Sequence, residues 1–358
     1  MKLDNLISEL CPTGVKCTRL GDVCDVLRGK RLTKAQLTDN DKYPVLHGGL
    51  TPMGYYSEFN RKAGTTIVVN TGNAGSVFYS DREFWSSDAC FSLYPHNGLL
   101  DRYLFHFVLQ NEPVLKGKIR TGAMPTIDAL AVESLLIPLP PLPVQQEIVR
   151  ILDSFTELTA ELTAELAAQR KQYEHYRDEL LTFRDNVPKA TLGEICDFNY
   201  GKGNNIPSEA GEYPVYGCNG IVSTTNVFNS EDAPIIGHIG SAGIVNWGAG
   251  KHYVTYNGTI CKANPEKVLS KYVYHLLCSL HLERFVKGSQ PFLSYGDFSK
   301  EIVSVPTLAE QQRVITLLDH FDTICNDLVS GLPAEIEARQ KQYEYYRDKL
   351  LTFKELAV

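Results

Sequence analysis

Basic and amide side chains gather with glycines at a few places in the chain, and this combination suits contact with nucleic acid. Arg28-Gly29-Lys30-Arg31 brings three cations together, and a Gly- and Asn-rich segment follows at 70–76. Cations pair with phosphate oxygens, whereas Arg suits guanine and Asn suits adenine at base edges. Glycines between them would let the backbone approach a duplex. We therefore expect these loops to bind DNA.

The candidate DNA contacts form two sets, one in each half of the chain. The first set is Arg28, Lys30, Arg31, Asn70, Gly72, Asn73, Ser76 and Met124. The second set is Lys202, Asn204, Asn205, His238, Ser241, Ser289 and Gln290. For each loop the alternative is an ordinary turn or a solvated basic surface. His47, His106 and His320 are interpreted as packing or surface residues.

Motifs that indicate catalysis are missing from the sequence. We find no G-x-x-x-x-G-K-S/T loop, no H-E-x-x-H, no G-x-S-x-G elbow and no cysteine pairs with zinc-site spacing. A DNA adenine methyltransferase would need Asn or Asp followed by two prolines and an aromatic residue. Asn264-Pro265-Glu266 lacks the second proline and the aromatic ring. We predict a chain with no catalytic residue, metal site or cofactor of its own.

Composition is that of a folded protein of more than one domain. The chain has 358 residues, a net charge of −7, and 43% hydrophobic residues, and this length exceeds what one core usually supports. Most of the excess acid lies in 144–186 and 308–358, which weakens the objection that negative charge raises against DNA binding. The nine scattered cysteines are interpreted as reduced thiols, and the lack of a run of about 18 apolar residues predicts a cytoplasmic location.

The second half of the chain repeats the first, in the same order. The ranges 72–77 and 240–245 share the pattern G-x-A-G-x-V, and the ranges 171–183 and 341–353 differ at only two positions. The helical segments match better than the segments between them. The chain is therefore a tandem duplication in which the intervening modules were free to diverge.

Two long helices are predicted from heptad seams. Apolar residues recur with 4-3 spacing from 145 to 183, just after Pro143, and again from 311 to 353, where Gly331-Leu332-Pro333 predicts a kink. A seam this long needs a partner, and the duplication favours antiparallel pairing of the two copies as a coiled coil. The alternative is an ordinary bundle core. The seam residues expected to set a spacing and dock partner subunits are Leu152, Phe155, Leu162, Leu166, Tyr173, Tyr176, Leu318, Phe321, Tyr343 and Tyr346.

The predicted fold class is α+β, with two mixed α/β modules alternating with the two helices. The expected domains are an N-terminal segment 1–14, modules 15–143 and 187–307, and helical regions 144–186 and 308–358. Thr65–Val69, Ala233–Ile236 and His252–Tyr256 have the residue types of strands. Amphipathic helices are expected at Asp101–Gln110 and Ser270–His281.

This arrangement resembles the specificity subunit of type I restriction-modification systems. The resemblance covers essentially the whole chain and is carried by the helix starts at Pro138–Ile148 and Pro306–Gln312 and by the K-Q-Y-E-x-Y-R-D-x-L-L helix ends. The second helix start has lost one of its prolines. The resemblance implies that each module reads one half of a split DNA target. It also implies that the helices fix the gap and dock two methyltransferase subunits, which would bring S-adenosylmethionine and methylate adenine. Restriction subunits would add ATP- and Mg-dependent cleavage.

A four-residue repeat gives the gap a physical basis. Thr159-Ala-Glu-Leu162 is followed at once by the identical Thr163-Ala-Glu-Leu166. Four helical residues add about 6 Å and a net turn of about 40°, close to the roughly 35° of one base pair. Three other functions remain open on sequence alone. They are a specificity-type subunit of another defence system, a bivalent scaffold or adhesin with a coiled-coil spacer, and an autonomous nuclease or methyltransferase. An autonomous nuclease or methyltransferase would show turnover by the purified chain.

Overall fold

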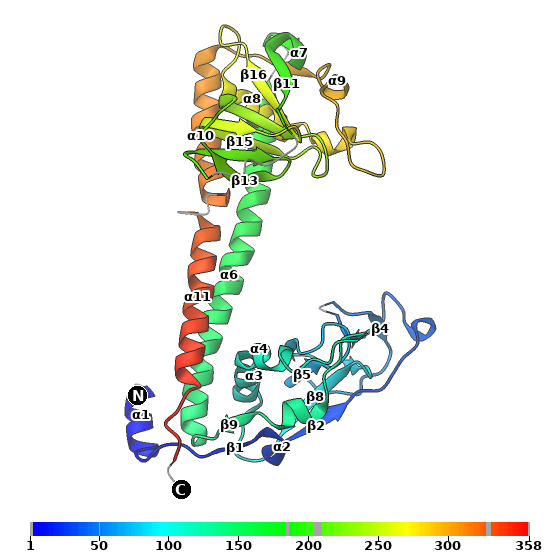
Figure 1. Ribbon diagram of the computed structural model, residues 1–358, viewed down its shortest axis with the longest axis vertical. Helices are drawn as coiled ribbons and strands as arrows, with labels where there is room; N and C mark the ends of the chain where they lie inside the picture. Colours follow the sequence, from blue (N-terminus) through cyan, green and yellow to red (C-terminus); the bar gives the residue numbers. More distant parts are fainter. Residues whose placement is uncertain are drawn as a thin grey trace. The chain divides into compact units, whose positions relative to one another are not determined.

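The computed structural model describes residues 3–49, 51–122, 124–183, 186–203, 210–326 and 331–356. It divides into a first unit, Met1–Glu161 with Ile336–Val358, and a second unit, Leu162–Glu335. The division passes through the continuous helix α6 (Leu142–Leu181), so each unit combines one module with parts of the long helices. Figure 1 labels the helices and strands and colours them along the sequence.

The first module is built from short strands and short helices. Its strands pair as β2-β8-β5-β6, β4-β3-β7 and β1-β9, and β5 is buried along its whole length because its β-branched side chains suit a covered sheet. Helix α3 packs on β5 and β6. The elements are α1 Leu3–Leu10, β1 Cys17–Arg19, α2 Leu20–Val23, β2 Cys24–Arg28, η1 Lys34–Gln36, β3 Tyr43–Leu46, β4 Gly54–Tyr56, β5 Thr65–Val69, β6 Val77–Ser80, β7 Trp85–Ser86, β8 Cys90–Pro95, α3 Asp101–Gln110, α4 Glu112–Lys116, α5 Ala129–Glu133 and β9 Leu136–Pro138.

The second module repeats this topology in a single larger sheet. Its order is β11-β16-β14-β15-β12-β13, with β10-β17 separate. In the first module β3 pairs in parallel with the short β7, whereas in the second β12 pairs in parallel with the end of the long β15, which joins the two sheets into one. The elements are β10 Lys189–Thr191, α7 Leu192–Ile195, β11 Cys196–Tyr200, β12 Tyr213–Gly217, β13 Gly220–Thr225, β14 Ser230–Gly237, β15 Val245–Val254, β16 Gly258–Ala263, α8 Ser270–Ser279, η2 Leu282–Phe285, α9 Tyr295–Phe298 and β17 Ile302–Ser304.

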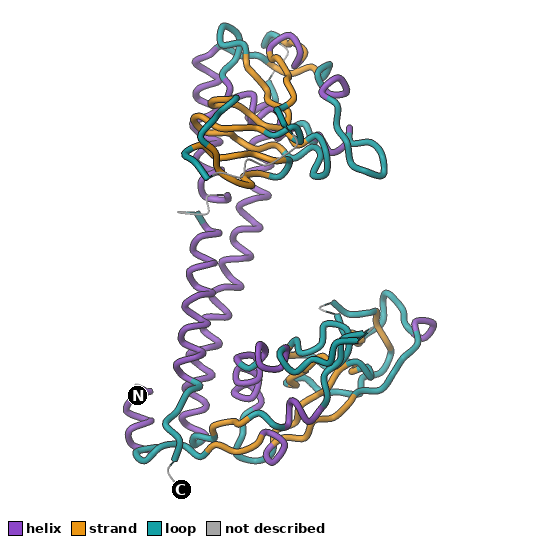
Figure 2. Tube along the Cα trace, in the orientation of Figure 1, coloured by secondary structure: helices purple, strands orange, loops and turns teal. Residues whose placement is uncertain are grey.

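The long helices follow the predicted seams. Helix α6 begins at Leu142, so the expected start after Pro143 was wrong; a proline is tolerated in a first turn because its missing N–H would have no helical partner there. The C-terminal seam is divided into α10 (Leu308–Asn326) and α11 (Leu332–Leu350). Figure 2 colours these helices purple and the strands of the two modules orange.

Aromatic seam residues meet in each unit. In the first unit Phe155 of α6 stacks on Tyr346 of α11, with ring centroids 5.3 Å apart. In the second unit Tyr176 of α6 stacks on Phe321 of α10 at 5.5 Å. Each unit therefore contains a stacked contact between α6 and the C-terminal seam, and the antiparallel coiled coil stays a prediction.

A buried glutamine ties the start of each long helix to its module. In the first unit Gln145 donates to the carbonyl oxygens of Gly98 and Pro140, each at 2.8 Å, and accepts from the amide of Leu100 at 3.0 Å. Gln311 repeats this arrangement in the second unit. These two residues are the shared Gln of the matched helix starts, which explains why this part of the motif was kept in both halves.

Candidate nucleic-acid interface

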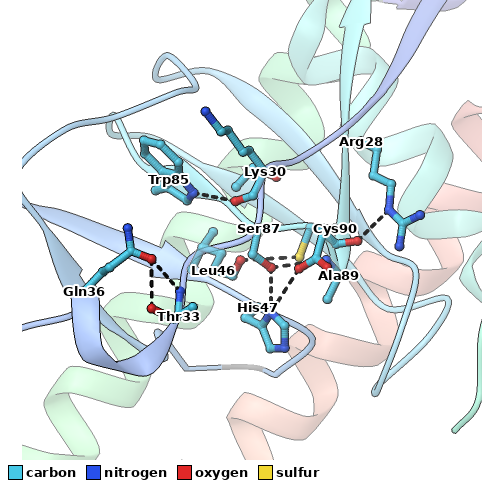
Figure 3. A network of polar contacts seen from close by, with 12 residues as sticks. Arg28, Lys30, Thr33, Gln36, Leu46, His47, Trp85, Ser87, Ala89 and Cys90 are labelled. Carbon is cyan, nitrogen blue, oxygen red and sulfur yellow. Dashed lines mark hydrogen bonds and ion pairs between the residues drawn. The ribbon is translucent and has the colours of Figure 1, made fainter.

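One turn, residues 86–90, organises the basic segment of the first module. The amide of Gly29 donates to the carbonyl oxygen of Cys90 at 3.0 Å, and the amide of Lys30 donates to Ser86 at 2.9 Å. Trp85 donates from its indole nitrogen to the carbonyl oxygen of Lys30 at 2.7 Å. Figure 3 shows the hydrogen bond from Trp85 to Lys30, with Arg28 on the same segment. The backbone of the segment is therefore fixed while the side chains of Lys30 and Arg31 are exposed.

Arg28 and Gly29 have structural roles in this segment. The Nε of Arg28 donates to the carbonyl oxygen of Asp88 at 2.8 Å, although the side chain is otherwise exposed. A Cβ on Gly29 would lie 2.2 Å from the carbonyl oxygen of Ser87. This glycine therefore allows the chain to approach its own turn, whereas the sequence suggested an approach to DNA.

The glycine-rich loop 70–76 lies against the same turn. The amide of Asn70 donates to the carbonyl oxygen of Ala89 at 2.9 Å, and the amide of Gly72 donates to Pro125 at 3.3 Å. Gly72 and Gly75 have φ values of +94° and +82°, a region that favours glycine. The loop is thereby joined to the hairpin that carries Met124. The basic segment 28–31 and the glycine loop 70–76 thus meet at one turn, and the hairpin is attached through the glycine loop. We call this arrangement of basic segment, glycine loop and hairpin around a turn a three-part junction.

The second module builds the same junction around the turn 254–258. The amide of Lys202 donates to the carbonyl oxygen of Val254 at 3.0 Å, and the amide of His238 donates to Asn257 at 3.0 Å. The amide of Gly240 donates to Pro291 at 3.0 Å, which joins the glycine loop to the hairpin of Ser289 and Gln290. The duplication is thus a duplication of this three-part junction.

Two candidate contacts need correction because their side chains are buried. Asn70 is 4% exposed and His238 is 1% exposed, since each ends a core strand and points inward. Burial also lowers the pKa of His238, whose ring packs on Tyr200 with centroids 4.5 Å apart. Neither side chain can reach a duplex from this position.

The other candidate side chains that the structure describes are at least partly exposed. Met124 is 61% exposed, and the positions that are exposed or half-buried are Arg28, Lys30, Arg31, Gly72, Asn73, Ser76, Lys202, Ser241, Ser289 and Gln290. Asn204 and Asn205 lie outside the described residues. Whether these side chains contact DNA stays a prediction.

Aromatic residues at the second junction were not selected from the sequence. Tyr256 belongs to the turn and is 41% exposed, Phe292 belongs to the hairpin and is 40% exposed, and both rings pack against His238. Exposed aromatic faces suit contact with thymine methyl groups and with unstacked bases. Phe292 lies two residues after the candidate Gln290, which was a signal for it, whereas Tyr256 ended the strand-like segment His252–Tyr256 with no sign of a binding role.

Two duplicated grooves lie away from these junctions, at the ends of the long helices. The first-unit groove, of about 570 Å³, is lined by the end of α11 together with Phe107 and Leu136. The second-unit groove, of about 500 Å³, is lined by the end of α6 together with Leu276 and Ile302. Leu136 and Ile302 are 64% and 68% exposed despite being apolar. The helix ends that form both grooves are the best-matched segments of the duplication.

In the described ranges, the cysteines form no disulfides and the potential metal ligands are not clustered. All nine cysteines are described and free of disulfides, and burial raises the pKa of Cys24 to about 12. Among the residues with defined placement, no three His, Cys, Asp or Glu side chains are grouped to hold a metal ion. Within those same ranges, no helix has both the length and the apolar run that crossing a bilayer requires.

Known proteins with similar sequences and folds share one description. The family model of the type I restriction modification DNA specificity domain matches residues 12–170 and again 185–338. A candidate type I restriction enzyme specificity subunit of Haemophilus influenzae is 28% identical over 93% of this chain and 94% of its own length. A type I restriction enzyme specificity subunit of Escherichia coli is 37% identical over 59% of this chain and 60% of its own.

A solved structure shares the fold along nearly the whole length. The type I restriction-modification S subunit of M. genitalium superimposes with a TM-score of 0.68 at 20% identity, covering 94% of this chain and 96% of that one. A chain from a structure of type I complex assembly and conformational transition gives a TM-score of 0.58 at 18% identity, covering 95% of this chain and 98% of its own.

Proposed function

We propose, from the premise that this chain belongs to the family of type I restriction-modification DNA specificity subunits, that each of its two modules reads one half of a split DNA target. The observation that carries this proposal is the repeated three-part junction. The same backbone contacts recur around 86–90 and 254–258, while the exposed side chains on them differ. Two similar frames with different side chains suit two different half-sites.

The exposed side chains fall into two chemical groups, one suited to phosphates and the other to bases. Lys30, Arg31 and Lys202 can neutralise phosphates and so position a module on the duplex. Asn73 and Gln290 can form paired hydrogen bonds with adenine, and Met124 can contact a thymine methyl group. Fixed backbones at both junctions favour affinity, because a rigid reader loses less entropy on binding.

The two grooves are the proposed docking sites for two methyltransferase subunits. Near-identical helix ends in both halves suit two copies of one partner, and the apolar residues Leu136 and Ile302 suit an apolar segment of that partner. On this proposal S-adenosylmethionine binds to the methyltransferase subunits, and ATP and Mg act on restriction subunits where these join. This chain then supplies DNA recognition and no bond-making chemistry.

Charge substitutions in the grooves test the docking proposal. L136K and I302K should each reduce the methyltransferase content of the co-purified complex from two subunits to one, and together they should abolish it. L130K and I221K are matched controls, because Leu130 and Ile221 are 70% and 62% exposed outside the grooves. Unchanged stoichiometry in the double variant would place the partner elsewhere. A chain that retains DNA but never a methyltransferase would favour another defence system.

Target binding tests the reading of split sites. The reconstituted complex should retain a DNA fragment that carries both half-sites far better than fragments with either half scrambled. Each mismatched base pair is expected to cost about 1–3 kcal/mol. Equal retention of all fragments would mean that the modules do not read sequence.

A further inference from the structure

A buried histidine joins three helices in the first unit. His106 of α3 has no exposed surface, its Nε2 lies 2.8 Å from Oδ1 of Asp153 on α6, and its Nδ1 lies 3.0 Å from the hydroxyl of Tyr343 on α11. A carboxylate can only accept, so Nε2 carries the proton and the Tyr343 hydroxyl donates to Nδ1. Arg102, one turn earlier on α3, donates to the same Asp153 oxygen at 2.8 Å. The module is thereby bonded to both long helices of its unit.

The second unit contains the same cluster with the long helices exchanged. His275 of α8 has no exposed surface, and its Nε2 lies 2.9 Å from Oδ1 of Asp319 on α10. Its Nδ1 lies 3.4 Å from the hydroxyl of Tyr173, which belongs to α6. Lys271 takes the place of Arg102, at 3.6 Å from Asp319. In each unit the aspartate comes from the helix that follows the module and the tyrosine from the helix paired with it.

Stability alone does not explain these clusters. Apolar side chains of similar volume would fill the space of the buried imidazole, and replacing buried hydrogen-bonded partners by apolar groups of the same shape can be nearly neutral or stabilising. Hydrogen bonds, unlike apolar contacts, fix direction. Both clusters persisted while the exposed side chains of the two junctions diverged. The two clusters therefore share a role in orienting a module on its helices, and not in recognising one target sequence.

We propose that His106 and His275 are positioning residues that hold each module at one angle on its helix pair, and that Tyr343 and Tyr173 make this angle depend on the second helix of the pair. This inference rests on the proposed reading of a split target. A module held at one angle presents its junction in phase with the other half-site, so the clusters limit which gap between half-sites is accepted. The clusters thus determine how strictly the complex rejects other gap lengths, whereas the length of the helices determines which gap is preferred.

Removing one hydroxyl tests the inference with little change in packing. In the complex with its methyltransferase, Y343F and Y173F keep the aromatic ring and the His–Asp bond but lose the bond to the second helix. The readout is the methylation rate on DNAs whose half-sites have the native gap, one base pair fewer or one more. The preference for the native gap should fall about three- to tenfold, the factor that one net hydrogen bond supports. Y345F, on an exposed neighbour in α11, should retain the wild-type preference.

A rescue and a stability measurement separate positioning from simple support. H106Q can still donate to Asp153 and accept from Tyr343, so it should keep more of the preference than H106A. If Y343F, Y173F and H106A lower the unfolding temperature but leave the gap preference at the wild-type value, the clusters are merely structural and the inference is wrong. If the wild-type complex itself shows no gap preference, the split-target function fails together with the inference, and the two failures are thereby told apart.

Discussion

Burial governs the charge of His106. Desolvation lowers the pKa of the imidazole, although the hydrogen bond and charge of Asp153 act in the opposite direction. Burial alone would raise the pKa of Asp153, but the hydrogen bond from His106 and the charge of Arg102 outweigh it and hold that pKa below its usual range. The folded first unit therefore combines a neutral imidazole with an ionised carboxylate.

Acid should destabilise the first unit through this histidine. Its contribution to stability is fully present above the unfolded pKa of about 6.5 and is lost as pH falls through the lower folded value. H106Q removes this titration, so the fall in unfolding temperature between about pH 7 and about pH 5 should be smaller in H106Q than in the wild type. Thermal unfolding at both pH values measures the difference. H320Q, on an exposed residue of α10, should behave as the wild type does, and an undiminished fall in H106Q would refute the assignment.

Lys30 and Arg31 should act on phosphates rather than on bases. Replacing both by Ala should weaken binding of the complex to all DNA sequences about equally, and the slope of log K against log salt should become shallower by about two. Binding isotherms at several salt concentrations measure this slope. The control is R150A, because Arg150 is exposed on α6 and paired with Glu147, away from the junctions. A change confined to one base of the target would instead make these residues base readers.

The sequence identified which residues lie at the junctions more accurately than it predicted which of their side chains are exposed. The matched glycine loops identified 70–76 and the loop beginning at His238, and the structure joins both loops to hairpins that carry the candidates Met124, Ser289 and Gln290. Asn70 and His238 were misjudged, because a polar residue at the end of a strand has the same pattern whether it points into the core or outward. The His106 cluster was also out of reach, since its three residues come from helices that only the fold brings together.

At the scale of elements, the continuous helix α6 should act as a ruler. Its repeat of Thr-Ala-Glu-Leu at 159–162 and 163–166 lies within a single 40-residue helix. Deletion of 163–166 preserves the helical residue types and removes about 6 Å and about 40° of net turn. The expected result is a target whose gap is one base pair shorter, because the rotation matches that of one base pair. Methylation mapping of the deletion variant measures the gap, and an unchanged gap would show that helix length does not set it.

Helices were predictable where their pattern was long, and sheets were not. The seams from 145 to 183 and from 311 to 353 anticipated α6, α10 and α11 because apolar spacing repeats over many turns. The strand order was left open, since β15 merges two sheets through a parallel pairing between Tyr216 and Val254 that no local pattern indicates. Short strands depend on partners distant in the sequence.

At the scale of the whole molecule, duplication and charge determine how the chain works with its partners. On the proposed function, the two matched modules would read two half-sites, and the two matched grooves would dock two methyltransferase subunits. The net charge of −7 opposes binding to a polyanion, so we expect the isolated chain to bind DNA weakly and the complex to bind it tightly. The duplication itself was fully visible in the sequence, because 171–183 and 341–353 are nearly identical.

The most direct test of the central claim is a genome-wide map of adenine methylation in cells that express this chain with its methyltransferase subunit. The chain should direct methylation to one motif, made of two specified half-sites separated by a gap of fixed length and unspecified sequence. Cells with the methyltransferase subunit alone should lack this motif. An uninterrupted motif, or the same methylation without the chain, would contradict the claim that its two modules read a split target.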